Sequence, residues 1–451
     1  MNFRALFAFA LCLGLFSQTA PIVEESFLRD PGPLDFLKGE GHEQAILQSL
    51  TGDSLVGLDT NGKVVPRLAH RWEISGDAVV FHLREDARFT RGAAVTAEDV
   101  IWTIQAIQRM DSASHTKRAI LHGVRVTGQG RRVELRSNRP AARLLMELAR
   151  VPIARQGHPD EGSGPFSLAI EKGEWRLKAR EHFLKPSIGG LRFRLIGDEQ
   201  AVFQNLQKGW LTLGVPPMRK GLQVPATHRE YRNGLLAQIT VWSRVGTAPL
   251  KALERWRSEV LPADFFNGRL KPSLGLLPEA LGFAPRAMDG EAGNLQGQRW
   301  DLLYPSGDGQ MEKVLLALRE RAKREGVILE PRPLETALFF ERIRKGDFSL
   351  ACAINVFDPH PWSVLDLMEP EGGANLAHWQ DPRLAKLVSR LTKPGDPAWN
   401  DLQNLWAERP TSLPLMDYVG CVWVDRRLKV QPGVLGIYLS TPGAAGWTWQ
   451  P

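Results

Sequence analysis

The sequence predicts a mixed α/β protein of two or three domains, and three observations support this prediction. The chain has 451 residues, and a single domain commonly holds about 150 residues. The composition is 43% hydrophobic and 24% charged, which is typical of globular proteins and argues against a disordered or polytopic membrane protein. Residues 300–331 show strand, helix and strand patterns in turn, the order of a βαβ unit.

The first twenty residues have the layout of a secretory signal peptide. Arg4 supplies a positive charge, residues 5–16 are apolar, and small or polar residues follow before Pro21. The apolar run is too short for a membrane helix, which needs about 20 residues. We expect residues 1–20 to be removed and the mature chain to be periplasmic. Leu11, directly before Cys12, is bulky and fits a lipoprotein cleavage site poorly, so we expect no lipid anchor.

Local patterns in the first half predict a hairpin, a helix and a long β-rich segment. Asn61-Gly62 lies between the apolar flanks of residues 55–65, which predicts a tight turn. Thr96 is followed three residues later by an acid and then by apolar residues at helical spacing, which predicts a helix N-terminus. Residues 78–83 read as a strand, and residues 124–195 as a β-rich segment with turns.

The second half alternates between predicted helices and strands. The predicted helices are 202–209, 250–260, 311–325 and 338–345, and the predicted strands are 210–213, 235–245, 300–304, 327–331 and 348–357. Residues 267–297 are rich in Gly, Pro and Ala and predict a loop.

No catalytic or cofactor motif is complete in the sequence. Residues 57–63 match the spacing of a phosphate-binding loop, but Val64 replaces the Ser or Thr that would hold Mg²⁺. His42-Glu43 resembles the start of a zinc-protease helix, but Ile46 stands where the second His is needed. The sequence also contains no G-x-S-x-G nucleophile elbow. We therefore expect a protein that is not an enzyme and needs no cofactor or metal.

Basic residues are concentrated in one region. The whole chain carries 57 Lys and Arg against 50 Asp and Glu, a net charge of +7. Residues 117–155 alone hold ten basic residues against Glu134 and Glu147. Such a region can bind an anionic partner or form a solvated sheet face, and the interleaved apolar residues favour the sheet face. No nucleic-acid-binding motif occurs, so we expect no nucleic-acid partner.

Two cysteines, Cys352 and Cys421, remain after the predicted signal peptide. Both lie in apolar, strand-like surroundings. Export would allow them to pair, because disulfides persist in oxidising compartments. The apolar surroundings favour two separate buried thiols, since Cys is commonly a small core residue.

A series of short motifs follows the same order as in one known family of binding proteins. The motifs are Val65-Pro-Arg-Leu-Ala-His-Arg-Trp-Glu73, Phe81-His-Leu-Arg84, Phe89-x-x-Gly92, Val95-Thr-Ala-Glu-Asp-Val100, Gly162-Ser-Gly-Pro-Phe166 and, near the end, Leu413-Pro-Leu415. Together they resemble the family 5 extracellular solute-binding proteins, the dipeptide- and oligopeptide-binding components of ABC importers. The resemblance extends over nearly all of the chain after the signal peptide.

The resemblance implies a type II periplasmic binding protein fold of the α/β class, with two lobes joined by two hinge strands and a ligand cleft between them. We expect residues 21–237 and 424–451 to form the larger lobe. Residues 238–423 should form the second lobe, including the hinge strands, with the hinges near residues 238–245 and 414–423. The lobes would close over a small-molecule or peptide ligand by hinge motion and deliver it, as a monomer, to ABC permease subunits.

The resemblance also places ligand contacts in two segments. One is Glu40, Gly41 and His42, and the other contains Asn355, Phe357, Asp358 and Trp362. The acids can accept from an ammonium group, Asn355 can donate and accept, and the aromatic rings can form apolar walls or belong to the core.

One departure from the family leaves the ligand class open. In the peptide binders, an aspartate three residues before an Asp-Pro pair binds the peptide ammonium, and here that position is Asn355. A nickel chelate, a sugar or an opine are therefore alternative ligands. A second alternative is a family member that feeds no transporter and serves as a sensory or interaction protein.

Overall fold

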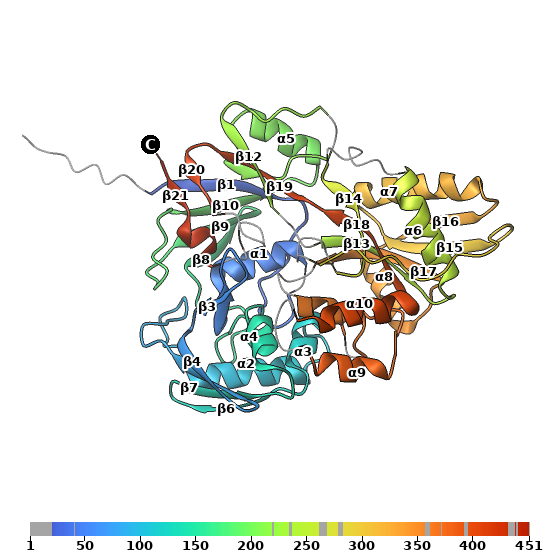
Figure 1. Cartoon of the computed structure of the whole chain (residues 1–451). Helices are drawn as coiled ribbons and strands as arrows, with labels where there is room; N and C mark the ends of the chain where they lie inside the picture. Colours follow the sequence, from blue (N-terminus) through green and yellow to red (C-terminus); the bar gives the residue numbers. More distant parts are fainter. Residues whose placement is uncertain are drawn as a thin grey trace, which may run out of the picture.

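A computed structural model describes residues 20–39, 41–218, 221–233, 237–260, 268–277, 283–356, 361–370, 372–391, 396–431, 438 and 441–450. The predicted signal peptide, apart from its last residue, lies outside the described residues, and so do Glu40, Phe357 and Asp358. The elements form two lobes (Figure 1). We call the part before residue 234 and after residue 419 the first lobe, and the part between them the second lobe.

Two sheets of the first lobe share one core. The four-stranded sheet has the order β1-β10-β9-β8, and the three-stranded sheet has the order β11-β19-β12. Their strands are β1 (Ile22–Phe27), β8 (Phe166–Glu171), β9 (Glu174–Ala179), β10 (Gly190–Leu195), β11 (Leu213–Gly214), β12 (His228–Asn233) and β19 (Gly420–Asp425). Helix α1 (His42–Thr51) packs its buried face, including Leu47 and Leu50, into this core with Phe166 and Val424.

A third sheet, β4-β5-β7-β6, covers the lower part of the first lobe in Figure 1. The elements of this region are β2 (Val56–Leu58), β3 (Val64–Pro66), β4 (Ala69–Ser75), β5 (Ala78–Leu83), β6 (Arg125–Gln129), β7 (Arg132–Arg136), α2 (Ala97–Arg109), α3 (His115–Leu121) and α4 (Ala141–Leu148). The predicted hairpin is confirmed as β2 and β3. The predicted helix start is also confirmed, because Thr96 and Asp99 form a capping box at the start of α2.

One sequence prediction in the first lobe is incomplete and another is wrong. The segment 124–195 is β-rich as predicted, with β6 to β10, but it also contains α4, whose residues are mostly strong helix formers with Leu144 and Leu148 buried on one face. The predicted strand 210–213 is absent apart from Leu213 in β11, and the side chain of Trp210 is 60% exposed. The helix before it, α5 (Glu199–Gln207), agrees with the prediction in type and lies close to the predicted bounds.

The second lobe is built on a six-stranded sheet with the order β14-β18-β13-β17-β15-β16. Its strands are β13 (Ala237–Ser243), β14 (Leu270–Pro272), β15 (Arg299–Pro305), β16 (Ile328–Leu334), β17 (Leu350–Val356) and β18 (Ser412–Tyr418). The helical elements are α6 (Ala248–Val260), α7 (Gly309–Lys323), α8 (Thr336–Lys345), a 3₁₀ helix η2 (Pro361–Leu367), α9 (Arg383–Val388) and α10 (Ala398–Glu408). The predicted βαβ unit is confirmed, since β15 and β16 pair in parallel around α7.

The chain passes between the lobes twice. Strand β12 belongs to the first lobe and β13 to the second, and only residues 234–236 separate them. Strands β18 and β19 belong to different lobes and are separated by Val419 alone. The lobe boundaries expected from the sequence, at residues 238 and 423, stay predictions.

The two cysteines are buried in different places. Cys352 lies in the core of the second lobe, and Cys421 packs with Trp423 in a small cluster of the first lobe. Both thiols are free, which confirms the interpretation as separate core residues. Among the described residues, no helix is long and apolar enough to cross a membrane.

Candidate functional site

The first-lobe segment of the candidate site lies at the start of helix α1. Gly41 caps the helix with a backbone φ of 91°, a conformation that favours glycine, and His42 is the first helical residue. The preceding loop is fixed from inside the helix, because Gln44 Nε2 donates to the carbonyl oxygens of Pro31 and Pro33 at 2.6 and 2.7 Å. The backbone that leads to Gly41 is therefore held by a buried amide.

A second buried amide extends this support. Gln48 Nε2 donates to the carbonyl oxygen of Asp35 at 2.9 Å, and Gln48 Oε1 accepts from Lys117 Nζ at 2.9 Å. The same ammonium group donates to the carbonyl oxygen of Phe36 at 2.7 Å. A Cβ at Gly39 would lie 2.3 Å from Gln48 Nε2, so only glycine fits against this network. Lys117, part of the basic region, is thus an internal support of the loop.

His42 is exposed at the surface of α1, yet protein surrounds it closely enough that desolvation lowers its pKa. The carboxylate of Glu43 opposes this shift, and the positive charge of Arg29 adds to it. The imidazole is therefore neutral near pH 7 and can both donate and accept a hydrogen bond.

The Gly162-Ser-Gly-Pro motif positions the other end of α1. A Cβ at Gly162 would lie 2.3 Å from the carbonyl oxygen of Thr51, and a Cβ at Gly164 would lie 2.6 Å from the nitrogen of Gly52. The Gly164 nitrogen donates to the carbonyl oxygen of Thr51 at 2.8 Å. Because both residues are glycines, residues 162–165, which lead into strand β8, can lie directly against the last turn of α1.

The second-lobe segment brings Asn355 into a row of polar side chains across the sheet. Gln238 on β13 pairs with Asn355 on β17 and with Asp417 on β18. Gln238 Nε2 donates to Asp417 Oδ1 at 2.7 Å, and Ser273 Oγ donates to the same oxygen. The row lies at the end of these strands where the chain crosses to the first lobe.

Several polar atoms in this region are buried without a hydrogen-bond partner among the described residues. They are Gln238 Oε1, Asn355 Nδ2 and Arg269 Nε. Arg269 lies beside the second crossing, because its carbonyl oxygen accepts from Val419 N at 2.8 Å. A buried polar atom without a partner costs about 1–3 kcal/mol, so a ligand that supplies partners here would gain from doing so.

The other residues expected in the second-lobe segment are placed differently. Trp362 is buried in the core, where its ring meets Trp399 edge-on at 5.7 Å between centroids and Nε1 donates to the carbonyl oxygen of Leu391. It therefore supports η2 from inside. Phe357 and Asp358 lie outside the described residues. Ile354 and Val356, on either side of Asn355, are exposed apolar residues on the same strand.

Sequence reasoning missed Gln238 and Asp417. Each is a polar residue in an otherwise apolar strand, Ala237–Ser243 and Ser412–Tyr418. A polar residue that interrupts a buried strand needs a hydrogen-bond partner, and this signal could have marked both positions.

Two polar contacts join the lobes near the crossings. Gln310 Nε2, at the start of α7, donates to both carboxylate oxygens of Glu199, at the start of α5, at 2.9 and 3.1 Å. Arg269 Nη1 donates to the carbonyl oxygen of Pro216. The lobes thus contact each other outside the two chain connections.

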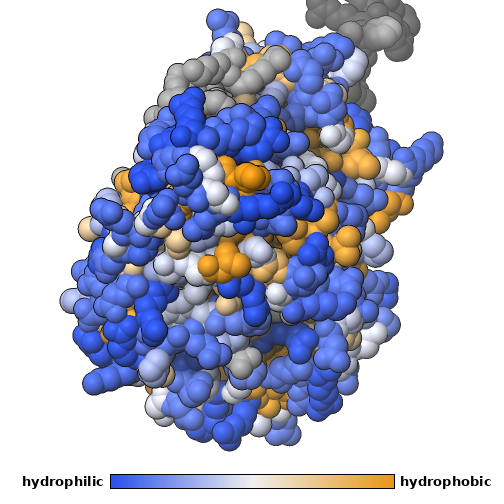
Figure 2. Space-filling view, turned by 90° about the vertical axis from the view of Figure 1, so that its right-hand side faces the viewer, coloured by the Kyte–Doolittle hydropathy of each residue, from blue (hydrophilic) through white to orange (hydrophobic). Residues whose placement is uncertain are grey.

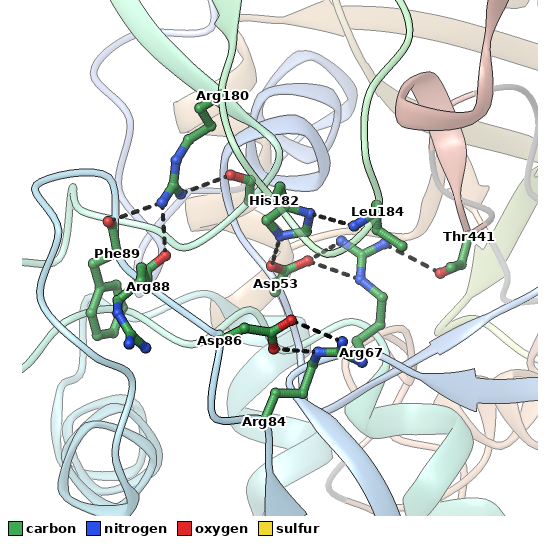
Figure 3. A network of polar contacts seen from close by, with 11 residues as sticks. Asp53, Arg67, Arg84, Asp86, Arg88, Phe89, Arg180, His182, Leu184 and Thr441 are labelled. Carbon is green, nitrogen blue, oxygen red and sulfur yellow. Dashed lines mark hydrogen bonds and ion pairs between the residues drawn. The ribbon is translucent and has the colours of Figure 1, made fainter.

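A buried polar network in the first lobe has the composition of a catalytic site but not its arrangement (Figure 3). His182 Nε2 donates to Asp53 Oδ2 at 2.8 Å, and His182 Nδ1 accepts from Leu184 N at 3.1 Å. Arg67 donates to the other carboxylate oxygen, Asp53 Oδ1, and also to Thr441 Oγ1. Both imidazole nitrogens are used, so none is left to activate a nucleophile. The network connects four segments of the first lobe, those that contain Asp53, Arg67, His182 and Thr441.

Part of the basic region forms ion pairs on the surface of the sheet β4-β5-β7-β6. Arg131 pairs with Glu85 at 2.9 Å, and Arg136 pairs with Asp77 at 2.8 Å and with Glu134 at 2.7 Å. These pairs favour the interpretation as a solvated sheet face. Among the described residues, no three His, Cys, Asp or Glu side chains are grouped as a metal site would require.

Two comparisons with known sequences identify similar proteins. Residues 63–223 match the family described as bacterial extracellular solute-binding proteins, family 5 (middle). A stretch of 74 residues is 39% identical to the probable deoxycholate-binding periplasmic protein YgiS of Escherichia coli K12. This stretch covers 16% of the present chain and 14% of YgiS.

The fold is shared with solved binding proteins over nearly the whole chain. The oligopeptide-binding protein AppA of Bacillus subtilis, in complex with a nonapeptide, is 14% identical with a TM-score of 0.80, and the match covers 96% of this chain and 100% of AppA. AgaA from A. tumefaciens R10, in complex with agropinic acid, is 16% identical with a TM-score of 0.80, covering 95% and 99%. The expected fold is confirmed, and residues 63–223 are similar to the family 5 extracellular solute-binding proteins.

Proposed function

We propose that this protein is the periplasmic solute-binding component of an ABC importer, which binds a peptide or a related small solute between its lobes and delivers it to the permease. The buried, unpartnered polar atoms beside the two chain crossings carry this proposal. Other buried polar atoms of the described residues also have no partner, but these three gather beside the chain crossings, where a ligand between the lobes could supply the missing partners. Family 5 proteins are solute-binding proteins, which agrees with a binding role.

The proposed site uses residues from both lobes. Gly41 and His42 are the proposed ligand contacts of the first lobe, and Asn355 and Gln238 are those of the second lobe; Glu40 is added to the first-lobe segment from its place in the sequence. Neutral donors and acceptors such as Asn355 Nδ2 and Gln238 Oε1 fit the main-chain groups of an extended peptide. Asp358 supplies a charge for a ligand ammonium group.

The ligand need not be a peptide. The residue at the ammonium-binding position of the peptide binders is the uncharged Asn355, and a charge-assisted bond is roughly twice as strong as a neutral one. AgaA holds agropinic acid on the same fold. A small polar acid of that kind is the alternative ligand class. As further parts of the proposal, the chain is exported, loses residues 1–20 and acts as a monomer.

Titration calorimetry with three probes tests the function. The probes are tri-alanine, agropinic acid and deoxycholate, each added to purified mature protein. We expect one of them to bind, and Asn355→Ala and Asp358→Ala to weaken an ammonium-bearing ligand by about 1.5–3 kcal/mol each. The control Asn404→Ala changes an amide on α10, away from the chain crossings. If the wild type binds none of the probes and purifies without a small molecule by native mass spectrometry, the importer function is refuted.

A further inference from the structure

Helix α4 of the first lobe is joined to the second lobe by one arginine. Arg143 Nη1 donates to Glu369 Oε1 at 2.8 Å, and Arg143 Nη2 donates to Glu369 Oε2 at 2.7 Å. The side chain of Arg143 is 3% exposed and that of Glu369 is 23% exposed. A two-bond arginine–carboxylate pair that is largely shielded from water is both strong and specific in its orientation.

Arg143 has a second acidic partner within its own lobe. Its Nε donates at 2.7 Å to Glu147 Oε1, one turn further along α4. The other oxygen of Glu147 accepts from Arg139 Nη1 at 2.8 Å. A buried charge that loses its only partner is costly, but Arg143 would keep Glu147 if Glu369 moved away. The Arg143–Glu369 bond can therefore break and form again while the Arg143 guanidinium keeps an acidic partner.

The partner on the second lobe is also held in place. Glu369 follows η2, and its carbonyl oxygen accepts from Asn375 Nδ2 at 3.1 Å. The Glu369 nitrogen donates to the carbonyl oxygen of Leu365 at 2.7 Å. On α4, Ala142 and Met146 pack against the core of the second lobe. The two charged groups thus meet where α4 also makes an apolar contact with the second lobe.

We propose that Arg143 and Glu369 form a latch that stabilises the arrangement in which the two lobes contact each other, here called closed, without any ligand, and that they thereby set ligand affinity from outside the ligand site. The inference rests on the proposed function, because closure matters for a protein that opens and closes on a solute. The latch consists of protein groups alone, so it favours closure equally for every ligand. A protein that is already partly closed binds with a correspondingly higher apparent affinity.

The test measures the ratio of closed to open molecules in the ligand-free mature protein by single-molecule fluorescence transfer. The dyes are placed on introduced cysteines at Thr127 of β6 and Asn400 of α10, which are exposed on different lobes. We expect Glu369→Gln to lower this ratio about 10- to 100-fold, the range for hydrogen bonds to charged groups. Arg143→Gln should produce the same shift, and the double variant no further shift.

A matched control exists inside the second lobe. Arg383 is also shared between two acids, Asp381 at 2.9 Å and Glu408 at 2.8 Å, but all three belong to the same lobe. Glu408→Gln should therefore leave the ratio within twofold of wild type. Circular dichroism checks that each variant is folded.

Two results would overturn the latch: a wild-type protein with no closed population, or a Glu369→Gln protein that closes as often as the Glu408→Gln control. Neither result depends on the identity of the ligand. A failure to find a ligand would count against the importer function and leave this measurement unaffected.

Discussion

Replacing Asp53 by asparagine tests whether the buried polar network of the first lobe stabilises the fold. The carboxylate accepts from Arg67 and from His182 Nε2 (Figure 3). An asparagine could accept from Arg67, but its amide would then face the N–H of His182. The ring cannot switch tautomer without loss, because its other nitrogen already accepts from Leu184 N.

The structure sets the size of the effect. The side chains of Asp53, Arg67 and His182 are 0%, 10% and 3% exposed. Removing one partner of a buried ion pair costs about 3–5 kcal/mol, because the remaining charge is left uncompensated. The neighbouring pair of Arg84 and Asp86 is a matched control, since Asp86 is 58% exposed. Asp86→Asn should cost less than about 1 kcal/mol.

Urea unfolding at several pH values is the assay. Burial raises the pKa of Asp53, but the charge of Arg67 and the hydrogen bonds from His182 and Arg67 outweigh burial and lower it. The carboxylate therefore stabilises the fold above its unfolded pKa of about 3.9, and this stabilisation is lost as the pH falls through the lowered folded value. The gap between wild type and Asp53→Asn should narrow below about pH 4. Equal costs for the two variants at pH 7, or a gap that does not change with pH, would refute the reasoning.

Three further changes test other parts of the first lobe and the thiols. Burial raises the pKa of Glu25 well above its usual value, so Glu25→Gln should increase the free energy of unfolding measured in urea at pH 7. This increase should grow with pH by at most about 1.4 kcal/mol per pH unit between the unfolded and folded pKa of Glu25. An increase that becomes smaller as the pH rises would contradict this. Gly164→Ala places a Cβ 2.5 Å from backbone and should cost about 1–3 kcal/mol in the same assay, whereas Gly309→Ala, with open space around it, should cost nothing. Burial raises the pKa of Cys421 to about 11 and also raises the pKa of Cys352. A thiol reagent at pH 8 should therefore modify neither cysteine in the folded protein and both cysteines in urea. Rapid labelling of the folded protein would contradict this, because it would show an accessible thiol.

The parts of the fold that could be predicted are those with local causes. The capping box at Thr96, the turn at Asn61-Gly62 and the βαβ unit around α7 each depend on residues close together in the chain. Helix α4 was missed because it is short and follows a long run of strand-like residues, although its composition favours a helix.

The candidate site could be predicted only in part, because its members come from distant segments. Asn355 was expected from its place before the Asp-Pro pair. Its cross-strand neighbours, Gln238 on β13 and Asp417 on β18, are far away in the sequence and meet only through the order of the second-lobe sheet. The same is true of Arg143 and Glu369, which are separated by 226 positions. No local pattern marks such pairs.

The position of β19 has a consequence for how the polypeptide is made. This strand comes from the last part of the chain but lies at the centre of its sheet, between β11 and β12. Before residues 420–425 emerge from the ribosome, β11 and β12 have no strand between them to pair with. The first lobe therefore cannot be completed during synthesis, however early its other sheets form, and a fragment that stops before β19 should expose two unpaired strand edges and aggregate. The first lobe therefore stays incompletely folded until synthesis is nearly finished, which agrees with the proposed export, since an exported chain that crosses a membrane unfolded must not complete its fold before it crosses.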